Sequence, residues 1–151
     1  MFCGLYGKNE IRTNSINNNS LVIKLNYKKF SMLFTGDIEE IAEKSIVTEY
    51  ANNLDNQQKD NKTVQSMLNA TVLKVAHHGS KTSSSLDFLG AVNPRYAVIG
   101  VGKNNTFGHP SDITIQRLEN QNVRIFRTDE MGEITIKTNG TKINFFTQIG
   151  T

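Results

Sequence analysis

The chain has 151 residues, of which 37% are hydrophobic, and this length suits one domain that can bury a core. No apolar stretch approaches the roughly 20 residues that a membrane-spanning helix needs, so the sequence predicts no membrane span. The single cysteine, Cys3, excludes an internal disulfide. A formal charge of +3 permits an anionic partner without requiring one.

The first part of the chain predicts a polar leader followed by a β-hairpin. Residues 1–20 are polar and end in an Asn-rich run, so we expect them to be loosely ordered. Two apolar runs then flank a polar Tyr-Lys-Lys turn, which is the pattern of a hairpin. These runs are Leu21–Asn26 and Ser31–Phe34.

After Asp37 the apolar period changes from strand to helix. Apolar residues recur about every four positions from Ile38 to Leu54, which predicts a helix with one apolar face. Residues 52–62 are charged and Asn-rich, and they suit either an exposed loop or an extended helix end.

The second part of the chain alternates apolar strands with short helices, which is typical of a layered α/β fold. A last hairpin is predicted around the turn Asn139-Gly140. The expected strands are Val72–Val75, Tyr96–Ile99, Val123–Phe126, Glu133–Lys137 and Lys142–Phe145, and the expected helices are Leu86–Leu89 and Asp112–Asn120.

Two of the apolar strands end in side chains that can bind metal. One leads into Thr35-Gly36-Asp37 and the other into His77-His78-Gly79-Ser80, while His109 follows a third strand. Open α/β sheets collect their ligands at such strand ends. The side chains of adjacent histidines usually point to different sides, so at most one histidine of this pair needs to be a metal ligand.

Each of these residues also has a structural interpretation. Asp37 stands three residues before Glu40 and can form a capping box at the start of the helix. The two adjacent histidines can lie in a polar turn whose serines cap the next helix, and His109 can be a loop residue before Pro110.

Other catalytic motifs are excluded by their spacing. Gly79–Thr82 and Gly100–Lys103 lack the glycine spacing of a phosphate-binding loop. The chain has no cysteine pair for a structural zinc and no Gly-x-Ser-x-Gly nucleophile turn.

Four ordered segments together resemble a known family, the metallo-β-lactamase-fold domain. The subgroup is the one found at the C-terminus of the competence DNA-uptake protein ComEC and in free-standing relatives, and the resemblance runs from about Asn17 to Phe146. It implies an α/β fold that is the second half of an αββα sandwich, with a mixed β-sheet flanked by helices. The chain is then a single partial domain over residues 1–151, with the family-like part at 21–146. The four segments are Thr35–Asp37, Leu73–Ser80, Gly102–Pro110 and Arg127–Asp129.

The same resemblance implies roles for individual side chains. Asp37 matches the bridging carboxylate, and His78 is the favoured histidine ligand, which leaves His77 to contact substrate. Arg127–Asp129 matches a turn between late strands and is expected to be structural. The implied metal ligands are Asp37, His78 and His77, the substrate contacts are Ser80, Asn105 and His109, and the catalytic groups are His77, His109 and Lys81.

The chain departs from the family at one decisive place, because it has no His-x-His-x-Asp-His motif. That motif supplies most metal ligands, and a catalytic zinc normally has three protein ligands and one open position. The resemblance therefore implies Zn or Mn in the intact family but an incomplete site here. We expect the C-terminal portion of a hydrolase for phosphodiester or nucleic-acid substrates, inactive alone, or a non-catalytic remnant that binds DNA or a protein through the same cleft.

From the predicted half-sandwich we also expect particular partners. Its inner sheet face should be apolar and uncovered, so a homodimer or a missing N-terminal half is expected to pack there. DNA is a further expected partner. A free-standing protein would be cytoplasmic, whereas part of a competence channel protein would lie on the extracytoplasmic face of the membrane.

Overall fold

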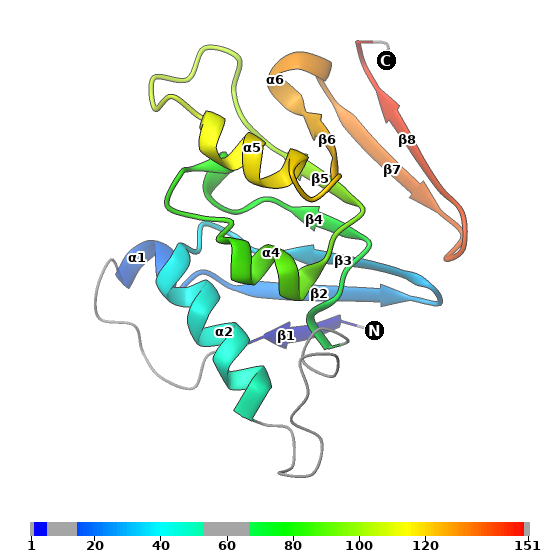
Figure 1. The fold of residues 1–151 in the computed structure, drawn as a ribbon. Coiled ribbons are helices and arrows are strands. Elements are labelled where there is room, and N and C mark those ends of the chain that lie inside the picture. Colours follow the sequence, from blue (N-terminus) through cyan, green and yellow to red (C-terminus); the bar gives the residue numbers. More distant parts are fainter. Residues whose placement is uncertain (1, 6–14, 53–66, 150–151) are drawn as a thin grey trace.

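The computed structural model describes residues 2–5, 15–52 and 67–149. Its main feature is a six-stranded sheet in the order β1-β2-β3-β4-β5-β6, beside a separate hairpin of β7 and β8 (Figure 1). The strands are β1 Phe2–Leu5, β2 Val22–Tyr27, β3 Phe30–Phe34, β4 Val72–Lys74, β5 Tyr96–Ile99, β6 Arg124–Arg127, β7 Ile134–Thr138 and β8 Ile143–Thr147. The helices are α1 Ser15–Asn18, α2 Glu40–Asn52, the 3-10 turn η1 Ala76–Gly79, α4 Leu86–Val92, α5 Asp112–Glu119 and α6 Thr128–Met131.

The sheet is mixed. Strands β1, β2 and β3 pair antiparallel, whereas β3 to β6 all pair parallel. The parallel strands therefore end at the same edge of the sheet, where the loops after β3, β4 and β5 lie side by side. The predicted α/β class, with a mixed sheet flanked by helices, is confirmed.

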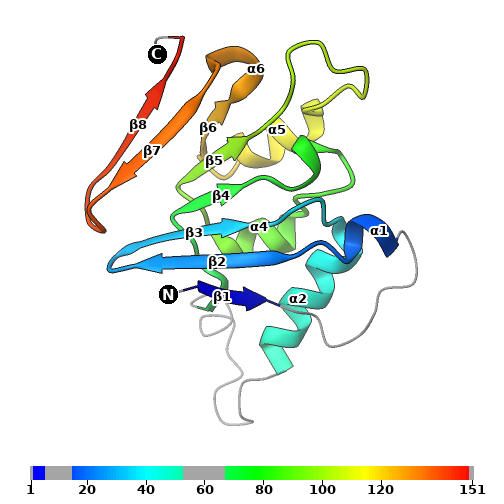
Figure 2. The ribbon, with the colours of Figure 1, turned by 180° about the vertical axis from the view of Figure 1, so that it is seen from behind.

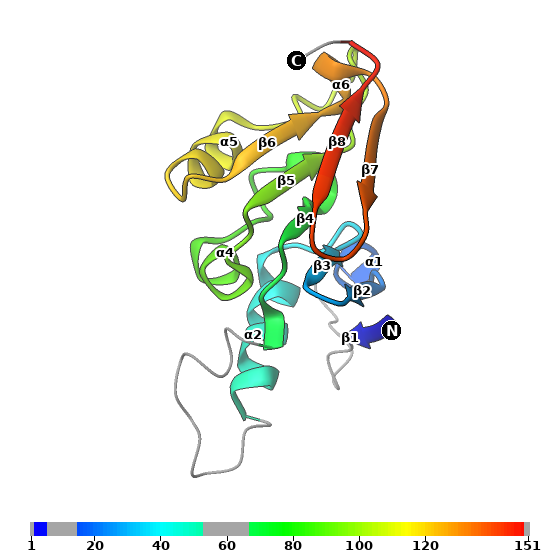
Figure 3. The same ribbon diagram turned by 90° about the vertical axis from the view of Figure 1, so that its right-hand side faces the viewer.

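Helices α2, α4 and α5 cover one face of the sheet (Figure 3). Leu33, Leu73 and Ala97 are aligned across β3, β4 and β5 and are all fully buried beneath these helices. The predicted apolar face of α2 is confirmed, since Ala42 and Ile46 lie in the same core. The helix begins at Glu40 rather than at the predicted Ile38, and the expectation for residues 53–62 lies outside the described residues.

The opposite face is partly covered by the chain itself (Figure 2). Phe145 of β8 stacks on Phe126 of β6 with ring centroids 4.1 Å apart, and it also contacts Tyr96 of β5. The prediction of an uncovered face is thus wrong for β5 and β6, because the terminal hairpin folds back over them. Met32 is half-buried and Phe34 is 37% exposed on the same face of the sheet, and a homodimer there stays a prediction.

Two described pieces of the predicted leader are held by the rest of the chain. Residues Phe2–Leu5 form β1 because the outer edge of β2 offers unpaired backbone groups to a further strand. Asn18, at the end of α1, is only 5% exposed and accepts a hydrogen bond from Glu39 N through its side chain. Residues Phe2–Leu5 and Ser15–Asn18 of the predicted leader thus have regular secondary structure, residues 6–14 lie outside the described residues, and loose order of the leader stays a prediction. The predicted turn at Arg127–Asp129 is the junction of β6 with α6, and an ion pair of 2.6 Å between Arg127 and Asp129 holds it.

None of the helices within the described ranges is long and apolar enough to cross a bilayer.

A buried acid ties α2 to the segment before α4. The Glu43 side chain is fully buried, and its carboxylate accepts hydrogen bonds from Ser84 N at 2.5 Å and Ser85 N at 2.8 Å. Burial raises the pKa of Glu43 above its ordinary value, although these hydrogen bonds oppose the shift. The buried carboxyl group satisfies backbone donors that would otherwise have no partner in the core.

Replacing Glu43 by Ala should lower the free energy of unfolding substantially. The change leaves buried backbone donors without acceptors, at about 1–3 kcal/mol for each donor. Urea denaturation of Glu43→Ala and of the exposed control Glu40→Ala would measure the difference. Equal stability of the two variants would contradict the role assigned to Glu43.

The raised pKa of Glu43 also predicts a pH dependence of stability. The folded state holds the proton more tightly than the unfolded state, so this stabilising contribution is complete below the ordinary Glu pKa of 4.5 and is lost as pH rises through the folded pKa. Urea titrations across acidic to neutral pH should show this loss in the parent chain, and Glu43→Gln should remove that part of the slope. An identical slope in both proteins would show that another group titrates.

Candidate functional site

The candidate site lies where the parallel strands β3, β4 and β5 end. The loop after β3 carries Asp37, and η1 after β4 carries both adjacent histidines. The backbone N–H of His77 donates to Gly36 O at 3.1 Å, so the two loops are joined directly. Asp37 N in turn donates to Ser20 Oγ at 3.1 Å, which ties the loop to the end of the leader.

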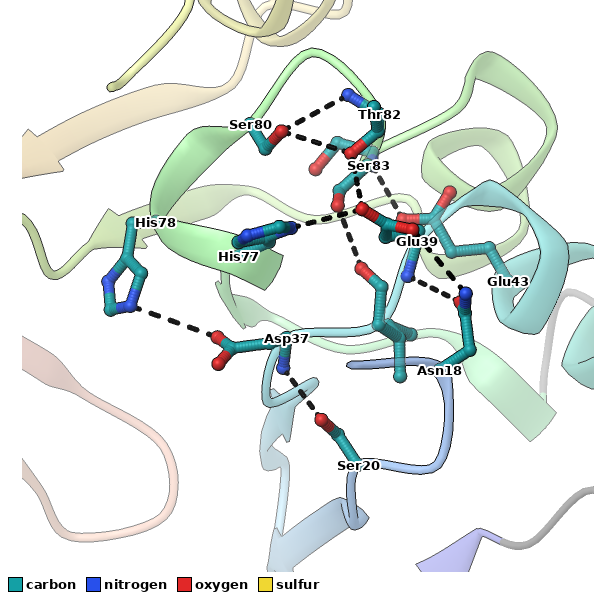
Figure 4. A network of polar contacts seen from close by, with 12 residues as sticks. Asn18, Ser20, Asp37, Glu39, Glu43, His77, His78, Ser80, Thr82 and Ser83 are labelled. Carbon is teal, nitrogen blue, oxygen red and sulfur yellow. Dashed lines mark hydrogen bonds and ion pairs between the residues drawn. The ribbon is translucent and has the colours of Figure 1, made fainter. Parts of the chain in front are cut away.

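The turn η1 has an unusual backbone. His77, His78 and Gly79 have φ values of 47°, 53° and 83°, in the left-handed region that favours glycine. Holding a non-glycine residue there costs about 1–3 kcal/mol, and such strain is concentrated at functional sites. A Cβ on Gly79 would lie 2.6 Å from Pro110 Cβ, so only glycine fits where the turn packs against Pro110. The histidine rings are directed to different carboxylates (Figure 4).

His78 faces Asp37, with its Nε2 3.8 Å from Asp37 Oδ1. The other ring nitrogen, Nδ1, lies 2.6 Å from Gly100 O, and it must donate because a carbonyl oxygen can only accept. In the neutral ring, the Nε2 lone pair is therefore left free on the side of Asp37. A second-shell bond of this kind is typical of histidines that bind metal.

His77 has a different carboxylate partner. Its Nδ1 lies 3.4 Å from Glu39 Oε1, which also accepts a hydrogen bond from Thr82 Oγ1 at 2.9 Å. The His77 ring meets the His109 ring edge to face, with centroids 5.6 Å apart. Glu39 was not predicted from the sequence, although it lies two residues after Asp37 in the same loop. The structure thus brings Asp37 and His78 together and places His77 beside Glu39.

Only one of the two helix-capping interpretations given for these segments holds in the structure. Asp37 lies three residues before Glu40, the first residue of α2, so the expected capping box with Asp37 at the N-cap is wrong. Ser85 does cap α4, since its side chain accepts from Phe88 N.

Lys74 is a second site residue that was not predicted from the sequence. Its ammonium donates to Val75 O at 2.9 Å, and burial lowers the pKa of Lys74, while the negative charge of Asp37 opposes that shift. A half-buried cation thus interacts electrostatically with the predicted bridging carboxylate. The available signal was a lysine within an otherwise apolar strand directly before the histidines.

Asn105 organises the loop that carries His109. Its Oδ1 accepts from Phe107 N at 3.2 Å and His109 N at 3.0 Å, and its Nδ2 donates to Gly102 O at 3.0 Å and His109 O at 2.7 Å. An amide side chain has two donor hydrogens and two acceptor lone pairs, so this capacity is fully used within the loop. Asn105 thus fixes the positions of its neighbours in the loop, and its predicted contact with substrate, which would require one of these hydrogen bonds to break, stays a prediction.

Ser80, Lys81 and His109 meet at one cavity of about 400 Å³, which residues 80–81, 107–109 and 111–113 line. Ser80 is buried, with its Oγ 3.0 Å from Thr82 Oγ1, whereas Lys81 is exposed. Burial lowers the pKa of His109, and the neighbouring His77 and His78 lower it further. Three predicted residues thus share this cavity, and the Asp37–His78 pair is formed by other loops.

Within the part of the chain that the structure describes, no group of three or more His, Cys, Asp or Glu side chains is placed to hold a metal ion. The roles of Asp37, His78 and His77 as metal ligands stay predictions.

Comparison with known proteins finds relatives of this α/β chain whose names refer to competence and to recombination. It is 35% identical to ComE operon protein 3 of Bacillus subtilis over 80% of its length, and 35% identical to competence protein ComA of Neisseria gonorrhoeae over 78%. It is 30% identical to recombination protein 2 of Haemophilus influenzae over 89% of its length. These relatives support a competence DNA-uptake family. The matched region is 14%, 15% and 14% of the three relatives, respectively, and no family model matches the chain.

Replacing Asn105 by Ala should loosen the loop that carries Phe107 and His109. The change removes the acceptor of two backbone N–H groups, and each lost hydrogen bond contributes about 0.5–1.5 kcal/mol. Hydrogen exchange should show faster exchange of the Phe107 and His109 amides in Asn105→Ala than in the exposed neighbour variant Asn104→Ala. Unchanged exchange would show that other contacts hold the loop.

Proposed function

We propose that the chain is the C-terminal portion of a metal-dependent hydrolase that acts on phosphodiester bonds of nucleic acid. The observation that carries the proposal is the Asp37–His78 pair, in which the bond from His78 Nδ1 to Gly100 O leaves Nε2 facing the carboxylate. The relatives named for competence and recombination support a substrate of nucleic-acid type.

The residues present fit a divalent metal as part of a site. Imidazole nitrogen and carboxylate oxygen suit Zn, and carboxylate oxygen suits Mn. The 3.8 Å between His78 Nε2 and Asp37 Oδ1 is compatible with two ligands of one cation at about 2.0–2.2 Å from each. The pair is 52% and 46% exposed, so a cation and further ligands can reach it from solvent.

A divalent cation bound there would supply a water of lowered pKa and polarise the phosphate oxygens. Around it, this chain's side chains have distinct tasks. Asp37 and His78 would hold the cation, and Lys74 adds positive charge near Asp37 that favours an anionic substrate. Glu39 orients His77, and this pair is arranged to hold or move a proton, as a general acid or base requires.

Two ligands do not complete a hydrolytic zinc site, which normally has three from protein. We therefore propose that a polypeptide segment with a His-x-His-x-Asp-His motif supplies the rest, as the first half of a metallo-β-lactamase-like sandwich would. The open part of the sheet face near Met32 and Phe34 suits the packing of such a segment.

The chain alone should hydrolyse single-stranded DNA and bis-phosphodiester dyes very slowly in Mn or Zn. Mixing it with a polypeptide that carries the missing motif should raise turnover if the two associate. Asp37→Ala or His78→Ala should then lower turnover by more than the about 10- to 100-fold typical of lost outer-shell partners, because each removes a ligand. The exposed control Glu40→Ala should keep it.

Three results would contradict this proposal. Robust hydrolysis by the chain alone, abolished by His78→Ala, would require a complete site within these residues. Association with the motif-bearing polypeptide and DNA binding, without turnover under any metal, would favour the non-catalytic binding role instead. Nanomolar zinc binding by the chain alone, measured by calorimetry, would contradict a two-ligand site.

A further inference from the structure

An exposed aromatic ring stands beside the candidate site on a loop that is firmly held. Phe107 is 80% exposed, although it is a large apolar side chain. Its backbone N–H is bonded to Asn105 Oδ1, and the same oxygen accepts from His109 N two residues on. These hydrogen bonds therefore fix the position of the backbone that carries the exposed ring.

The cavity defined above lies against this ring and contains both flat and polar groups. The rings of Phe107 and His109 lie nearly parallel, with an interplanar angle of 22° and centroids 6.1 Å apart. Lys81 and Asp112 contribute opposite charges to the lining, and Ser80 and Ser111 also line it. Its volume of about 400 Å³ falls in the range of about 300–1,000 Å³ that is usual for small organic ligands.

We propose that this cavity binds a nucleobase of single-stranded DNA, which stacks on Phe107 while the adjoining phosphate lies at Lys81. The inference rests on the proposed function for its substrate class. Proteins that bind single strands combine aromatic side chains, on which bases stack, with cationic groups that follow the backbone. The Phe107 cavity has one group of each kind.

The local charges favour a base over a bare phosphate. Asp112 offsets the charge of Lys81 within the same lining, so the cavity as a whole does not concentrate positive charge. Stacking on an exposed ring does not depend on net charge, and it accepts any base because every base has a flat face.

The position of the cavity links binding to the candidate active site. His109 lines the cavity and also contacts His77, whose own partner is Glu39. His77 and His78 are adjacent in η1, and His78 faces Asp37. A base stacked on Phe107 is therefore connected to the Asp37–His78 pair through the contact of His109 with His77 and the backbone of η1.

The chain has no tryptophan, so Phe107→Trp places a single fluorescent reporter at the proposed contact. Titration with a short oligothymidylate, in chelator, should quench this tryptophan, because a stacked base quenches indole emission. An abasic oligomer of the same length, a duplex and inorganic phosphate should not quench it. Tyr27→Trp, at the far end of β2, is the matched control and should not respond.

A second measurement compares oligonucleotide binding by the parent protein, which keeps Phe107, with binding by variants at this position. Anisotropy of a labelled oligothymidylate should show at least about fivefold weaker binding to Phe107→Ala, whereas Phe107→Tyr should bind like the parent. Lys81→Ala should weaken the oligothymidylate and the abasic oligomer by the same factor. Unchanged binding by Phe107→Ala, or equal quenching by abasic and base-bearing oligomers, would overturn the inference.

Because the titration is carried out in chelator, it tests base binding independently of metal-dependent hydrolysis. Quenching without turnover in any metal-loaded assembly would keep the base-binding cavity and reject the hydrolase. Turnover that depends on Asp37, without quenching at position 107, would keep the hydrolase and reject the cavity as a base site.

Discussion

The hydrogen bond from His77 N to Gly36 O is the contact on which the candidate site depends. It joins the loop after β3 to the loop after β4 and so sets the distance between Asp37 and the two histidines. The parallel pairing of β3 with β4 brings these loops to one edge, but sheet pairing alone does not orient their side chains. The left-handed turn at His77–Gly79 provides that orientation, because it sends one ring to Asp37 and the other to Glu39.

The strain of that turn is balanced by contacts around it. Gly79 O accepts from Ser111 N, and Ser80 O accepts from Thr114 Oγ1, so the start of α5 holds the turn from one side. Beneath it, Glu43 binds the backbone of Ser84 and Ser85, and Ser83 Oγ donates to Ile38 O. Buried hydrogen bonds of this kind leave little freedom to the segment between η1 and α4, which keeps the histidines in a costly conformation.

Much of the fold follows from local sequence signals, whereas the site follows from them only in part. Alternating apolar runs and the Asn139-Gly140 turn identify the strands and the last hairpin, because these signals are local. Strand β1 was not predicted, since the short segment Phe2–Leu5 forms a strand by pairing with β2, which is distant in sequence. The Asp37–His78 pair was anticipated from strand ends. Glu39 and Lys74 were missed because their partners are set by loop geometry.

Asn105, which was predicted to contact substrate, holds together the loop that carries His109. Its place in the loop before His109 suggested a phosphate contact, yet all of its hydrogen-bonding capacity is used to shape that loop. The large apolar side chain that this loop exposes to solvent is Phe107, which no spacing rule singles out. Polar groups in such a loop can therefore act through the backbone they organise. The rings of His77 and His109 are in contact where the His109 loop meets η1. The Asp37–His78 pair lies on one side of this contact, and the exposed ring of Phe107 lies on the other.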